Sequence, residues 1–173
     1  CAGYFHSTSY LIAIGCKAGK CSPSPGIYIG LKAGENAGAG SHVLIGVNAG
    51  RAHQTPGSYS VMIGNNSGCG SRHGCSNVFL GGGSAVGNYD GSCNIAIGRC
   101  SGPYTVNEGN GSFNFSGGWR TGSCILTGNS NVFIGVSAGV GYTSGSNNIS
   151  IGTTVGPQIC GASGNYNIAF GHA

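Results

Sequence analysis

Residue types used in catalysis and metal binding occur in this sequence, but their spacing does not build a site. The stretch Cys69-Gly-Ser-Arg-His73-Gly-Cys75 offers three zinc-ligand side chains at a spacing unusual for zinc, and so many cysteines favour disulfides instead. The stretch Gly135-Val-Ser137-Ala-Gly139 matches the nucleophile pattern of serine hydrolases. It is, however, one copy of a repeat that runs along the whole chain, with serine at a variable position.

Carboxylates and imidazoles are equally scattered. The only acids are Glu35, Asp90 and Glu108, each in the loop region of a different repeat, so catalysis by paired carboxylates is not expected. The histidines share no position in the repeat that would form a proton relay or a metal array: His6, His42, His53, His73 and His172. We therefore expect a protein that is not an enzyme and that uses no cofactor or metal.

The composition is typical of an extracellular repeat protein. Glycine accounts for 37 of 173 residues and charged residues for only 6%, while nine cysteines favour an oxidising location, outside the cell or on a cell or virion surface. The net charge of +4 comes from seven scattered Lys and Arg residues, without the basic runs of a nucleic-acid-binding protein. No stretch approaches the roughly 20 apolar residues of a membrane span, so no span is expected.

One phrase recurs along the chain: apolar, any, apolar, Gly, any, any, small, Gly. It reads IAIGCKAG near the start and VFIGVSAG later, with a degenerate FSGGWRTG between them and a truncated IAFGHA at the end. Ten turn glycines, spaced 15 to 20 residues apart, anchor the copies: Gly15, Gly30, Gly46, Gly64, Gly81, Gly98, Gly118, Gly135, Gly152 and Gly171. A second glycine stands seven residues before most anchors, so length variation is confined to one loop.

Each copy holds a short strand with period 2, such as Ile95-Ala96-Ile97, which places two aliphatic residues on one face and a variable residue on the other. A strand this short cannot bury its apolar face alone, but copies stacked at ~4.8 Å would bury it together. The sequence therefore predicts an all-β fold, a parallel β-solenoid of about ten coils, forming one uncapped domain over residues 1–173 with the aliphatic pairs inside.

The middle residue of each strand is then expected to face outward. These residues form a stripe whose central part is large and apolar: Ala13, Tyr28, Leu44, Met62, Phe79, Ala96, Ser116, Phe133, Ser150 and Ala169. A contiguous apolar stripe on a rod indicates a contact surface. We expect a loop of the same chain or a neighbouring chain to cover it, rather than a small molecule.

An asparagine stands just before the strand in six copies: Asn77, Asn94, Asn114, Asn131, Asn148 and Asn167. In stacked coils these residues would align into a ladder whose amides hydrogen-bond from coil to coil. The alternative is that asparagine is simply tolerant of turn geometry. The sequence does not decide between the two.

The strand motif followed by a small-Gly step, as in IAIGCKAG, resembles the head repeats of trimeric autotransporter adhesins, and similar Gly- and Asn-rich repeats occur in phage tail fibres. The resemblance covers nearly the whole chain, although this repeat is longer than the family's usual one and the cysteines are foreign to it. It implies a left-handed parallel β-roll with a surface role, and it raises trimeric assembly as an option.

The two ends of the chain lack the atypical caps with which most solenoids close. The start, Cys1-Ala2-Gly3, is a small-Gly step without its strand, and the end, Gly171-His172-Ala173, is a strand without most of that step. We therefore expect subunits to stack head to tail into an open fibril, with lateral contacts as a further option. The alternative is that the chain is part of a longer protein whose neighbouring coils are not included.

The cysteines allow several pairings. Cys75 and Cys93 occupy nearly the same position in consecutive copies, as do Cys1 and Cys16, so both pairs are candidate disulfides between stacked coils. Local alternatives are Cys16–Cys21 and Cys69–Cys75. Because nine is an odd number, at least one thiol is free or pairs with another chain.

Two functions fit these observations. The leading one is a structural subunit of an extracellular fibril, stacked head to tail and reinforced by disulfides. The alternative is an adhesin head or tail-fibre module that holds surface glycans with loop residues such as Tyr89, Tyr104 and Trp119. Four Asn-x-Ser sequons are candidate sites for glycans carried by the protein itself: Asn65, Asn110, Asn114 and Asn148.

Overall fold

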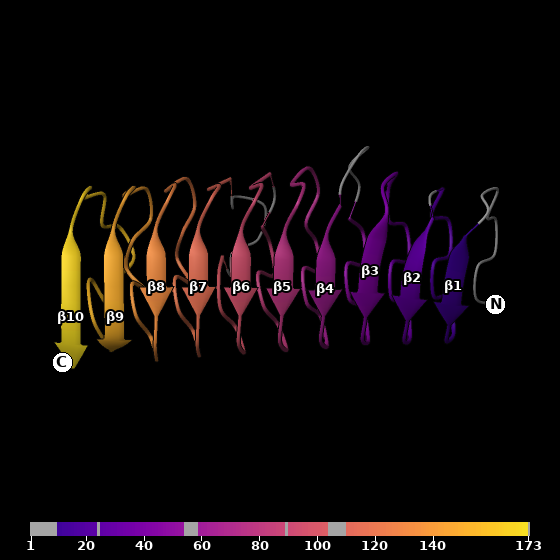
Figure 1. Cartoon of the computed structure of the whole chain (residues 1–173), viewed down its shortest axis with the longest axis horizontal. Coiled ribbons are helices and arrows are strands. Elements are labelled where there is room, and N and C mark those ends of the chain that lie inside the picture. The colour runs from indigo at the N-terminus through magenta and orange to yellow at the C-terminus, as the bar shows by residue number, and fades with distance from the viewer. Residues whose placement is uncertain (1–9, 24, 54–58, 89, 104–109, 173) are drawn as a thin grey trace.

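The computed structural model describes residues 10–23, 25–53, 59–88, 90–103 and 110–172, which wind into one rod of stacked coils (Figure 1). Ten strands, joined by about nine turns, form a single parallel sheet in chain order. They are β1 (Leu11–Ile14), β2 (Gly26–Ile29), β3 (His42–Ile45), β4 (Val61–Ile63), β5 (Val78–Leu80), β6 (Ile95–Ile97), β7 (Phe115–Gly117), β8 (Val132–Ile134), β9 (Ile149–Thr153) and β10 (Ile168–His172). This confirms the predicted parallel β-solenoid. The described residues include no helix that could cross a membrane.

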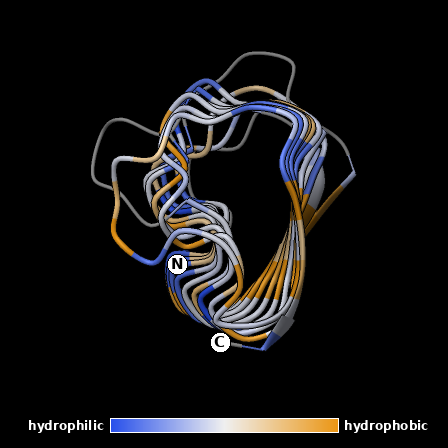
Figure 2. Ribbon diagram, turned by 90° about the vertical axis from the view of Figure 1, so that its left-hand side faces the viewer, coloured by the Kyte–Doolittle hydropathy of each residue, from blue (hydrophilic) through white to orange (hydrophobic). Residues whose placement is uncertain are grey.

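The strands pair so that equivalent residues of the repeat stack in columns. In the middle of the sheet, for example, Val43 pairs with Val61, and Val61 pairs with Val78. Viewed along the rod, the strands of all coils overlie one another on one straight side (Figure 2). The differences in repeat length therefore do not disturb the sheet, because the loops absorb them.

The strands face the opposite way from the prediction. Their middle residues point into the coil, where the largest are fully buried: Tyr28, Leu44, Met62, Phe79 and Phe133. The aliphatic pairs lie on the outer face, where Ile95 and Ile97 are 38% and 41% exposed. The expected outward stripe was wrong because a period of two separates two faces without saying which is inside. The interior has room for one large side chain per coil rather than two.

The small-Gly step of the repeat provides the space that these large inward side chains occupy. A Cβ atom on Gly68 would collide with the sulfur of Met62, and one on Gly139 would collide with the ring of Phe133. The residue before this glycine is also buried, as Ala138 is. The core is therefore built from large residues on the strand that face alanine, serine and glycine across a narrow interior.

The anchor glycines end the strands at positive φ. At Gly46, φ is 131°, and a Cβ atom would collide with the carbonyl group of Gly64 in the next coil. The same collision would occur all along the column from Gly15 to Gly152. Both the backbone conformation and the close stacking of coils therefore require glycine at this position.

The structure contains the asparagine ladder. From Asn94 to Asn167, each backbone N–H donates to the Oδ1 atom of the asparagine one coil earlier, over 2.8 to 3.0 Å. From Asn77 to Asn148, each Nδ2 donates to a glycine carbonyl in the next coil. The ladder begins at β5, because the equivalent positions in β2 to β4 are Gly26, His42 and Ser60.

Candidate assembly surfaces

The described part of the chain brings few side chains with catalytic or metal-binding potential together. Within the described ranges, no three His, Cys, Asp or Glu side chains come together as a metal-binding group. The nearly buried carboxylate of Glu35 lies 3.4 Å from Arg51 Nε and 3.8 Å from Lys17 Nζ. Its charge is thus balanced within its own part of the rod, while Glu108 lies outside the described residues.

His42 and His53 form a buried pair that the sequence analysis missed. Both are at most 1% exposed, and their rings meet edge to face with centroids 5.1 Å apart. Burial lowers the pKa of each to about 4, and the neighbouring His53 lowers the pKa of His42 further. Both imidazoles are therefore neutral at neutral pH. The signal was present in the sequence, since His42 stands at the ladder position just before the aliphatic part of its strand.

One disulfide forms among the described cysteines, between Cys124 and Cys160, with Cα atoms 5.7 Å apart. Its partners are 36 residues apart and lie in the loops that follow β7 and β9. It therefore spans the intervening coil of β8 and ties three coils together. No sequence pattern predicted this pair, because the two cysteines stand two copies apart.

The expected Cys75–Cys93 disulfide is not formed, and both residues are free thiols. Cys75 lies beside Ser92, whose Oγ accepts a hydrogen bond from the Cys75 N–H over 3.1 Å. The two cysteines are therefore one residue out of register. Cys16 is also a free thiol, and its expected partner Cys1 lies outside the described residues.

Burial removes two of the four candidate glycan acceptors. Asn114 and Asn148 are rungs of the ladder, 3% and 0% exposed, with their amides already hydrogen-bonded inside the coil. They cannot accept a glycan in the folded protein. Asn65 and Asn110 are exposed and remain candidates.

The outer face of the sheet carries two columns of apolar side chains, which we call the aliphatic face. Seen down the rod, it is the apolar band along the straight side of the coil (Figure 2). One column contains Ile12, Ile27, Val43, Val61, Val78, Ile95, Phe115, Val132, Ile149 and Ile168, and the other Ile14, Ile29, Ile45, Ile63, Leu80, Ile97, Gly117, Ile134, Ile151 and Phe170. Neither column contains a charged residue.

The size of the aliphatic face can be compared with known interfaces. Ten strands spaced ~4.8 Å apart and three residues wide give a face of about 450 Å². That is as large as the largest apolar patch on a typical monomer, and such patches are often functional. Two copies placed face to face would bury about 900 Å² in total, which is below the 1,200 Å² or more of a stable pair.

The described residues leave a strand edge without a paired neighbour at each end of the rod. Within the described residues, β1 pairs only with β2, and β10 pairs only with β9. Ile14 is 60% and Phe170 is 68% exposed, and a Cβ on Gly171 would have no neighbour within 4 Å. Neither strand contains the lysine, proline or bulge that usually protects a sheet edge.

The edges at the two ends match each other column by column. The register that runs through the sheet aligns Ile168 with Ile12, Ala169 with Ala13 and Gly171 with Gly15. At the C-terminal edge, no described residue donates to the Oδ1 of Asn167, the last rung of the ladder. The expected stacking residues Cys1, Ala2, Gly3 and Ala173 lie outside the described residues, whereas Gly171 and His172 lie in β10.

Comparison of the chain with protein-family models, with curated proteins and with solved structures gives no match. The β-solenoid fold is compatible with the β-roll that the strand motif led us to expect, and the resemblance to adhesin head repeats rests on that motif.

Proposed function

We propose that the chain is a structural subunit of an extracellular fibril in which β10 of one subunit pairs with β1 of the next. The observation that supports this most strongly is the match between the two open edges, where apolar, alanine and glycine positions coincide. The stacked edges would continue the parallel sheet without a break. A contact between two different surfaces that does not close on itself produces an open filament.

The aliphatic face gives such a filament a second contact. A pair of isolated subunits would bury too little area to stay together laterally. Once subunits are stacked, however, their aliphatic faces form one continuous strip, and each facing pair of subunits contributes about 900 Å² to a paired filament. We therefore propose that filaments associate side by side through this strip, and that end-to-end stacking comes first.

Electron microscopy of the native protein and of an edge variant tests the stacking. In the inner coils, the N–H of the first aliphatic residue donates to the next coil, as Ile149 donates to the Asn167 carbonyl over 2.8 Å. At Ile168 this donor lacks a partner in the described chain, so Ile168→Pro breaks no hydrogen bond among the described residues and prevents the bond to the next subunit. We expect filaments with an axial repeat of about 48 Å for the native protein, as ten coils would give, and short single rods for Ile168→Pro.

The conservative variant Ile168→Val is the matched control and should still form filaments. Filaments of Ile168→Pro that are as long as those of the native protein would rule out β10 as the contact. A native protein that stays as single rods at every concentration would overturn the proposed function as a whole.

A further inference from the structure

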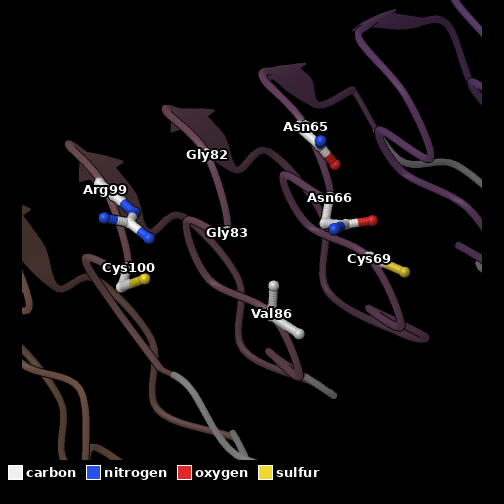
Figure 3. Close-up of a pocket in the computed structure, with 8 residues that line it drawn as sticks. All are labelled: Asn65, Asn66, Cys69, Gly82, Gly83, Val86, Arg99 and Cys100. Carbon is white, nitrogen blue, oxygen red and sulfur yellow. The ribbon is translucent and has the colours of Figure 1, made fainter.

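A groove on the side of the rod lies just past the anchor glycines of β4, β5 and β6. It has a volume of about 400 Å³, and its wall residues are Asn65, Asn66, Cys69, Gly82, Gly83, Val86, Arg99 and Cys100. Figure 3 shows Arg99 and Cys100 on one coil, Asn65 and Asn66 on another, and Gly82 and Gly83 on the coil between them.

The groove exists because the middle coil has no side chains at this place. Backbone hydrogen bonds align Gly82 with Asn65 on one side and with Arg99 on the other. A Cβ on Gly82 would meet only the Asn65 carbonyl at 4.0 Å, and one on Gly83 would meet only the Cys100 sulfur at 3.6 Å. Side chains two coils apart, separated by about 10 Å, therefore face each other across bare backbone.

A second hollow of about 420 Å³ continues this groove toward the C-terminus. Its wall residues are Cys100, Arg120, Ser123 and Cys124, so the two hollows share Cys100. Trp119 lies one coil after Arg99, at the same position of the repeat, and is 47% exposed. The centre of its ring lies 5.8 Å from the guanidinium carbon of Arg120. The combined groove thus runs along the rod over four coils, from β4 to β7.

The groove is positively charged, and no acidic side chain of the described residues balances the charges of its two arginines. Glu35 pairs with Lys17 and Arg51, and no acidic side chain among the described residues forms an ion pair with Arg99 or Arg120. Burial raises the pKa of the Cys69 thiol, against an opposing effect of Arg51, so this thiol brings no negative charge to the groove.

We propose that this groove binds an acidic polysaccharide lying along the rod. The guanidinium groups of Arg99 and Arg120 would each bind a carboxylate of the polymer through two parallel hydrogen bonds. The side-chain amides of Asn65 and Asn66 can both donate to and accept from sugar hydroxyls, and bare glycine backbone lets a ring approach closely. Trp119 supplies an exposed apolar surface with a polar edge beside these groups.

The wall chemistry favours a polysaccharide over other polyanions. A polyuronate brings hydroxyl groups beside every carboxylate, which the amides of Asn65 and Asn66 can bind alongside the guanidinium groups, whereas a DNA backbone offers phosphates without hydroxyl groups. Trp119 is also one of the three loop residues that the sequence suggested for binding glycans. The other two, Tyr89 and Tyr104, lie outside the described residues. This inference does not depend on filament formation, because the groove lies within a single subunit.

Calorimetry with a defined sugar tests the proposal, using a hexamer of galacturonic acid as the acidic probe and cellohexaose as the neutral one. We expect the acidic hexamer to bind and the neutral one not to bind. Arg99→Ala and Arg120→Ala should each weaken binding about tenfold or more, as expected for the loss of hydrogen bonds between charged groups. Gly82→Leu should also abolish binding, because it fills the groove at a position where β2's coil carries Leu31.

Two variants outside the groove serve as matched controls. Lys32→Ala removes one cation at the repeat position equivalent to Arg120. Thr153→Leu adds one leucine at the repeat position equivalent to Gly82. Both variants should bind the acidic hexamer like the native protein. Equal weakening by Lys32→Ala and Arg99→Ala would show nonspecific attraction and overturn the proposal. Binding of the neutral hexamer as tight as the acidic one, no binding of either sugar, or full displacement by equimolar inorganic sulfate would also overturn it.

Discussion

The coils of β2 to β4 and those of β5 to β10 share one backbone arrangement. They differ in which residue stands just before the strand and in what that residue contacts. In β5 to β10 this position is always asparagine, and the side-chain amides link each of these coils to the next. In β3 it is His42, which packs against His53 instead. One half of the rod therefore depends on amide hydrogen bonds, and the other on two imidazoles that must stay neutral.

The comparison shows that coil stacking alone does not determine how a solenoid responds to its surroundings. An amide has no charge to gain between pH 3 and 8, roughly, while a buried imidazole does. Contacts in a solenoid reach only neighbouring coils, so each half should respond separately. Four changes test this difference between the two halves of the rod.

Acid should destabilise the N-terminal half. The folded pKa of about 4 for His42 and His53 lies below the ordinary 6.5, so the unfolded chain binds more protons between these values. Their stabilising contribution is complete above pH 6.5 and is lost as the pH falls toward 4, by about 3 kcal/mol for each imidazole. Hydrogen exchange at pH 4.5 should show loss of protection in β2 to β4 before β5 to β10. The exposed-histidine variant His73→Asn should behave like the native chain, and equal loss in both halves would contradict the prediction.

Removing the disulfide should weaken the C-terminal half. The Cys124–Cys160 bridge closes a loop of 36 residues, and replacing both cysteines by serine should cost about 2–4 kcal/mol. The measurement is thermal unfolding with and without reductant. Cys16→Ser, a free thiol in the other half, should leave the transition unchanged. A double variant as stable as the native protein would show that the bridge does not restrain the unfolded chain.

Breaking one rung should destabilise the ladder locally. Asn131→Ala leaves the Gly145 carbonyl and the Asn148 N–H without their partners, at a cost of about 3 kcal/mol. Asn129→Ala is the matched control, because Asn129 also bonds across coils but is exposed to water. It should cost well under half as much. Urea unfolding of the two variants gives the comparison, and equal losses would mean that burial of the ladder contributes nothing.

A polar residue in the core of the C-terminal half should be dispensable. Ser150 points inward at a position where β3 carries Leu44, and its buried Oγ has no hydrogen-bond partner. Ser150→Ala removes this unsatisfied group without leaving a large cavity, and should stabilise the protein by about 1 kcal/mol. The same urea unfolding measures it. A loss of stability of similar size would indicate that the hydroxyl has a partner in solution.

The columns of the fold could be predicted from the sequence, but their orientation and pairing could not. Anchor glycines and ladder asparagines recur at constant offsets, so their alignment follows from the repeat itself. The inward position of Phe79 and Phe133 could not be predicted, because it depends on the space opened by glycines on the opposite wall. The Cys124–Cys160 pair was equally hidden, because its two cysteines stand two copies apart and no repeat offset relates them.

The parallel sheet also determines how the rod would carry a mechanical load. The hydrogen bonds between coils run along the rod axis, so a pull from end to end loads the contacts between successive coils in series. In such a chain of contacts, the weakest one breaks first, however strong the others are. The disulfide between the loops after β7 and β9 shields two successive contacts from this load, and the asparagine ladder strengthens those from β5 onward. Tension would therefore open the rod first among β1 to β4, the part that contains His42 and His53 and has neither the disulfide nor the ladder.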